Sequence, residues 1–112
     1  MTEKKVLLFA LCICAKDGLI SSIEADTILS LFNESVKNKD LPFKKLSNAS
    51  FKLIIDEFFF SDEQLESYCQ DIKEAEYLEK ILEIAKISAS SDGFDILENI
   101  AYQKALALLD KN

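Results

Sequence analysis

The longest unbroken apolar run of the chain covers ten residues, Val6–Ala15, and follows two lysines. This order resembles a signal peptide, but no small residues of the A-x-A type follow the run. Ten residues are also too few to span a bilayer, which needs about 20. The pattern therefore predicts a buried helix in a soluble, cytoplasmic protein without membrane insertion.

The pattern of apolar and polar positions occurs twice. Residues 6–19 (VLLFALCICAKDGL) align with residues 81–94 (ILEIAKISASSDGF), so that Asp17-Gly18 matches Asp92-Gly93. Beyond the glycine the second copy is one residue shorter. Each copy predicts a helix, an Asp-Gly turn and a second helix, and therefore a helical hairpin.

Each copy also holds signals for where its helices end and begin. The two glycines can adopt a positive φ and end the preceding helix. A polar residue followed three positions later by Glu is typical of a capping box, and such boxes occur at Ser21–Glu24 and Asp95–Glu98. Apolar residues then recur at helical spacing from Ile23 and from Leu97.

The middle segment, about residues 38–75, joins the two hairpins. Pro42 disfavours helix in the residue before it, so the second helix ends near Asn38. The apolar spacing predicts a helix over about Phe51–Phe60, and Ser61 begins another. We expect a compact all-α bundle of five to six helices in one domain, residues 1–112. Its parts are repeat 1 at about 5–37, connecting helices at about 43–75, and repeat 2 at about 76–110.

The first helix is apolar on the face that is polar in the second copy. Its residues Leu8, Leu11 and Ile13 correspond to Glu, Lys and Ser in the repeat. A helix that is apolar all round is buried on all sides. Either the middle segment or a partner chain must cover it, and we favour the middle segment.

Composition excludes several classes of function. The 112 residues carry a net charge of −7 and contain no Arg, His or Trp. Nucleic-acid recognition relies on positive charge and on Arg forks, and His is needed for Ser-His or Cys-His catalysis and for His-ligated metals. The three cysteines, Cys12, Cys14 and Cys69, include no C-x-x-C pair and are predicted to be small buried residues in a reducing compartment.

Two stretches, AKDGLISSIEADTIL and ASSDGFDILENIAYQKAL, resemble the paired D-G…E signature of the tellurite-resistance TerB-like family. That family includes a domain of the DjlA co-chaperones. The resemblance implies an all-α domain with pseudo-twofold hairpins, an acidic metal-binding cluster near the turns and a link to stress response. The chain departs from the usual pattern in its shorter second turn and in Ser90-Ser91.

The acidic residues near the two turns are candidate ligands of Ca²⁺ or Mg²⁺, because hard cations prefer carboxylate oxygens. They are Asp17, Glu24, Asp92, Asp95 and Glu98. A true EF-hand is excluded, since Ile13 and Ala15 would occupy its first two ligand positions. The alternative is that these acids only cap helices and complement the helix dipoles.

Surplus apolar residues are candidates for a surface that binds a protein partner or a second copy. They are Leu8, Leu11, Ile13, Phe58, Phe59 and Phe60. Three adjacent Phe on one helix cannot all face one core, because successive residues are about 100° apart. The alternative is packing within the monomer. We expect a non-enzymatic binding or adaptor module, with a metal-binding protein as the alternative function.

Overall fold

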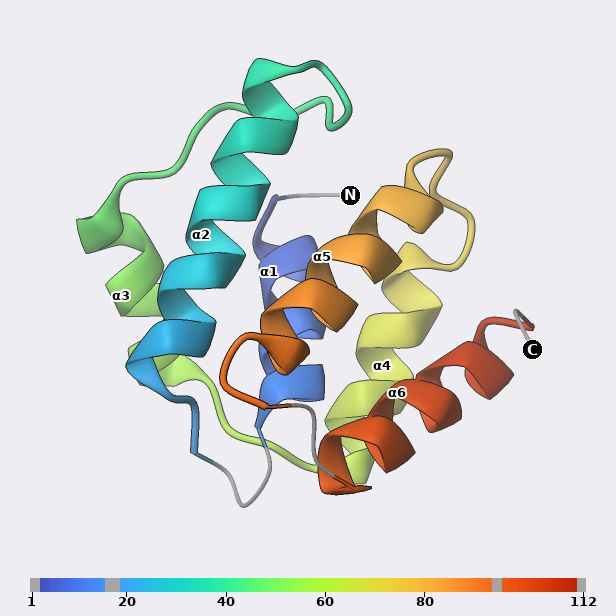
Figure 1. The fold of residues 1–112 in the computed structure, drawn as a ribbon. Helices are drawn as coiled ribbons and strands as arrows, with labels where there is room; N and C mark the ends of the chain where they lie inside the picture. The colour runs from blue at the N-terminus through green and yellow to red at the C-terminus, as the bar shows by residue number, and fades with distance from the viewer. Residues whose placement is uncertain (1–2, 16–18, 94–95, 111–112) are drawn as a thin grey trace.

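The structure of the chain is a computed structural model, and it describes residues 3–15, 19–93 and 96–110. These residues form six α-helices and no strand, as the sequence predicts (Figure 1). The helices are α1 (Glu3–Cys14), α2 (Ser22–Lys37), α3 (Asn48–Glu57), α4 (Asp62–Ile72), α5 (Leu78–Ser90) and α6 (Ile96–Leu108).

The first helix is the centre of the fold. It contacts each of the other five helices, most extensively α5 and α4 (Figure 1). Because α1 meets all five other helices, all of its apolar residues except the half-buried Leu8 are buried within the chain. The expectation that the middle segment helps to cover this helix is confirmed, since both α3 and α4 contact it.

Three serines begin helices as N-caps. The Ser21 hydroxyl accepts a hydrogen bond from the Glu24 backbone at 3.1 Å, and Glu24 Oε1 accepts one from the Ser21 backbone at 3.0 Å. This is the predicted capping box. Ser47 and Ser61 cap α3 and α4 in the same way with their hydroxyls. The second predicted box depends on Asp95, which lies outside the described residues.

A side chain of α2 holds the long connection to α3 in place. The Asn33 amide accepts a hydrogen bond from the Leu46 backbone N–H at 2.8 Å and donates one to its carbonyl at 2.9 Å. The second helix ends at the predicted position, with Asn38 as its C-cap.

The predicted helix over Phe51–Phe60 begins earlier and ends earlier than expected. Ser47 caps it at the start, and Phe58 leaves the helix in an extended conformation (φ −74°, ψ 140°). Phe58, Phe59 and Phe60 therefore lie in the extended link to α4, where successive side chains point in different directions. The prediction that these three Phe residues lie on one helix was therefore wrong.

No helix in the described part of the chain combines the length and the apolar character that crossing a membrane requires.

Candidate metal centre

Two glutamates of the predicted acidic set are fully buried. Glu24 lies in the first turn of α2 and is 1 % exposed, and Glu98 lies in the first turn of α6 and is 0 % exposed. The two glutamates occupy the same position in the two copies of the sequence repeat, three residues after Ser21 and after Asp95. A glutamate with so little contact with water is unusual unless its charge is compensated.

Asp92 completes the cluster from a third direction. It follows α5 in the turn before Gly93, whose φ of 99° confirms the predicted left-handed conformation. Carboxylate oxygens of Glu24, Asp92 and Glu98 all lie within 4.8 Å of one another. The structure thus brings together three of the five predicted ligands, and Asp17 and Asp95 lie outside the described residues.

The capping box uses only half of the Glu24 carboxylate. Its Oε1 accepts the bond from Ser21, whereas Oε2 is buried and no hydrogen-bond donor of residues 3–15, 19–93 or 96–110 reaches it. Helix capping explains the position of Glu24 but leaves this second oxygen unexplained.

Electrostatics disfavours the ionised cluster on its own. Two ionised carboxylates within 4.8 Å of each other repel by roughly 3 kcal/mol or more at an effective dielectric constant of about 20. Each glutamate also lies at a helix N-terminus, but such a position contributes only about 0.3 to 1 kcal/mol. A positive charge among the three carboxylates would offset the remaining repulsion.

The donor set suits a hard cation. All three side chains offer oxygen, and the chain has no His. The three cysteines lie buried in the core, as predicted. Burial raises the pKa of the Cys12 thiol from 9.0 to about 12, so it stays protonated and is a poor ligand.

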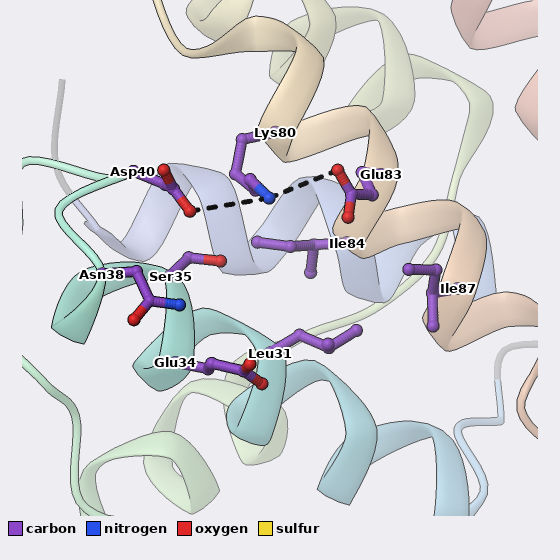
Figure 2. Close-up of a pocket in the computed structure, with 9 residues that line it drawn as sticks. All are labelled: Leu31, Glu34, Ser35, Asn38, Asp40, Lys80, Glu83, Ile84 and Ile87. Carbon is purple, nitrogen blue, oxygen red and sulfur yellow. Dashed lines mark hydrogen bonds and ion pairs between the residues drawn. The ribbon is translucent and has the colours of Figure 1, made fainter.

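A polar hollow of about 80 Å³ lies elsewhere, between α2 and α5 (Figure 2). Lys80 points between two acids there, with its Nζ 3.7 Å from Asp40 and 3.3 Å from Glu83. The hydrogen bond to Glu83 raises the pKa of Lys80, so the amine stays protonated and is not a nucleophile. This arrangement is an ion-pair network that joins the end of α2 to α5.

The candidate interaction surface is not continuous. Leu11 and Ile13 are buried in the core beneath the other helices. The prediction that they belong to an interaction surface was therefore wrong. Leu8, Phe58 and Phe60 are half-buried, and Phe59 is exposed.

Several apolar side chains at the starts of α2 and α6 are exposed. Ile23 and Leu97, each directly before a buried glutamate, are 53 % and 50 % exposed. Ile96 and Ile100 are exposed as well. Glu24 and Glu98 occupy matching positions in the sequence repeat, and both are buried at the starts of their helices. The repeat was therefore the one signal in the sequence that could have indicated their burial.

No family model matches this chain, and neither the curated proteins nor the solved structures contain a match to it. The resemblance to the TerB-like family therefore rests on the two sequence motifs alone.

Proposed function

We propose that this chain is a non-enzymatic module that binds a divalent cation through Glu24, Asp92 and Glu98. The observation that carries the proposal is the meeting of two buried glutamates from different helices with Asp92, together with a Glu24 oxygen that the helix cap does not use. A cation would neutralise the cluster and join the starts of α2 and α6 to the end of α5.

Calcium fits this site better than magnesium. Ca²⁺ binds six to eight oxygens at about 2.3 to 2.6 Å in flexible geometry, so its opposite ligands lie about 4.6 to 5.2 Å apart. The carboxylate oxygens lie within 4.8 Å of one another, which does not exceed this largest separation between two ligands of one Ca²⁺. Mg²⁺ needs a tighter octahedron at about 2.1 Å and usually keeps several waters with one or two carboxylates. A site of three carboxylates therefore favours Ca²⁺.

The TerB-like resemblance implies an acidic metal-binding cluster near the two turns, which supports the proposal. Paired hairpins related by a pseudo-twofold axis and a role in tellurite or stress response, which the resemblance also implies, remain part of the proposal. A second candidate function, a protein-binding or adaptor module, is favoured by the exposed apolar residues at the start of α6. The two functions are compatible, because Glu98 faces inward where its neighbours face outward.

The test is calorimetric titration and thermal unfolding with Ca²⁺, Mg²⁺ and Mn²⁺. Ligand at 100 times its Kd stabilises a protein by about 2.7 kcal/mol, and for a chain of this size each kcal/mol raises Tm by about 4 to 8 °C. We expect Ca²⁺ to raise Tm and the double variant Glu24→Gln/Glu98→Gln to lose the effect.

Asp26→Asn is the matched control. Asp26 is an exposed acid in the same helix as Glu24 and is not part of the cluster. This variant should keep the full response to Ca²⁺. Absence of any Ca²⁺ effect on the unaltered protein at millimolar concentration contradicts the proposal, as does an equal loss in Asp26→Asn.

A further inference from the structure

An apolar groove opens between α4 and α6, and the buried glutamate of α6 does not line it. Leu97 and Ile100, which are 50 % and 57 % exposed, line it from α6, and Phe60 and Leu65 line it from the opposite wall. Ala15 and Ala101 complete the apolar lining, and the ion pair Asp62–Lys104 stands at its edge at 3.3 Å. We refer to these eight residues as the α4–α6 groove.

The size of the groove fits one large apolar side chain. Its volume is about 160 Å³, and an apolar cavity of about 150 Å³ in another protein accommodates benzene. Ile96, also exposed, extends the apolar surface beyond the groove at the start of α6. A hollow of this kind, bordered by exposed apolar residues, is typical of a pocket that takes an anchoring side chain of a partner.

The charges around the groove select the kind of partner. Residues 61–72, which include α4, contain four acidic residues and no basic one. The acids near the start of α6 do not add to this charge, because Glu98 is buried in the carboxylate cluster with Asp92. Lys104 is the basic residue that lines the groove, and Asp62 already pairs with it. The surroundings are therefore apolar and acidic.

A second copy of the chain is a poor occupant, because it would bring a net charge of −7 and the same acidic helix α4 against the groove. An anionic membrane is disfavoured by the same repulsion. A helix with leucines on one face and lysines or arginines beside them complements both the apolar lining and the acidic surroundings of the groove.

We propose that the α4–α6 groove binds a basic amphipathic helix of a partner protein, with a large apolar side chain between Leu97 and Ile100. Basic residues of that helix then face Asp62 and the exposed Glu66 one turn later on α4. This role is independent of the cation proposed above, since none of the three carboxylates of the metal site lines the groove.

The test uses a fluorescein-labelled model helix composed only of Leu and Lys at helical spacing, with fluorescence anisotropy as the readout. A helix with Glu in place of every Lys is the control peptide. We expect the Leu/Lys helix to bind, the Leu/Glu helix not to bind, and binding to weaken with salt.

Surface variants separate docking in the groove from general attraction to an acidic protein. Leu97→Ser and Ile100→Ser should each weaken binding about tenfold or more, because a large apolar side chain buried in an interface contributes about 1.5 to 3 kcal/mol. Leu53→Ser is the matched control: Leu53 is 65 % exposed on α3, away from the groove. It should bind as the unaltered protein does.

Three results would overturn the proposal. The first is equal affinity in Leu97→Ser, Ile100→Ser and Leu53→Ser. The second is a dimer in sedimentation velocity that Leu97→Ser dissociates, which would assign the groove to a second copy. The third is binding to phosphatidylcholine vesicles, lost in Leu97→Ser, without binding to the peptide.

Discussion

Glu24 and Glu98 lie 74 positions apart in the chain, yet both are buried and their carboxylates meet within 4.8 Å. Each begins a helix, and each has an exposed apolar neighbour directly before it. Like-charged side chains are rarely buried together without compensation, so this pair is the best guide to function in the molecule.

Glu24→Gln should separate charge from capping. Glutamine can still accept the Ser21 hydrogen bond, because its side-chain oxygen serves in a capping box as glutamate does. Without divalent cations, we expect the free energy of unfolding to rise by about 1 to 3 kcal/mol as the repulsion within the cluster is relieved. With Ca²⁺ bound, Glu24→Gln should instead be less stable than the unaltered protein, because the variant has lost a ligand of the cation. Urea unfolding followed by circular dichroism measures both.

Ser21→Ala is the control for that experiment. It removes the cap and should cost about 1 kcal/mol whether or not Ca²⁺ is present. If Glu24→Gln leaves the free energy of unfolding unchanged with and without Ca²⁺, while Ser21→Ala lowers it in both conditions, Glu24 serves only as a capping residue.

The core around α1 should be sensitive to truncation at Leu11. This residue is fully buried, so Leu11→Ala is expected to lower the free energy of unfolding by about 2 to 5 kcal/mol. Leu8→Ala, on the same helix but half-buried, should cost clearly less. Chemical denaturation of the two variants checks the difference, and equal losses would contradict the burial that separates these residues.

Stability should decrease at alkaline pH because of the buried thiols. Burial, followed by the proximity of Cys69 and Asp62, raises the pKa of Cys12 from 9.0 to about 12. Between these values the folded state holds a proton that the unfolded state has released, so the free energy of unfolding falls as pH rises. Cys69, whose pKa burial raises to about 11, acts in the same direction.

Thermal unfolding from about pH 8 to about pH 11 measures this slope, and Cys12→Ala should make it shallower. Tyr68 and Tyr102, with pKa values also raised by burial, act in the same direction. Cys12 also raises the pKa of Tyr68, so Cys12→Ala reduces that contribution as well. An identical slope in Cys12→Ala would exclude a contribution of this thiol.

The sequence was sufficient for the helices whose ends have local causes. Ser21, Ser61 and Gly93 act within one turn of their own positions, so their roles in starting or ending helices could be predicted without knowledge of the tertiary fold. The uninterrupted apolar sequence of the first helix likewise predicted that this helix lies at the centre of the fold, because other helices must cover such a sequence.

Orientation within a helix could not be predicted where two signals disagree. At the starts of α2 and α6, the helical spacing from Ile23 and Leu97 did not decide which side chains face inward, and the structure buries the adjacent glutamates instead. The link that contains Phe58 was also unpredictable, because extended and helical backbone place the same three aromatic side chains differently. These departures from simple patterning coincide with the proposed cation site and the edge of the proposed groove.

The central position of α1 has a consequence for synthesis of the chain. A ribosome makes residues 3–14 before the other five helices, and the helix with which α1 has its most extensive contacts, α5, begins only at residue 78. For the time needed to add more than sixty residues, the most apolar segment of the protein lacks its main cover. At roughly 5 to 20 residues per second this lasts several seconds, long enough for chaperones to engage the nascent chain.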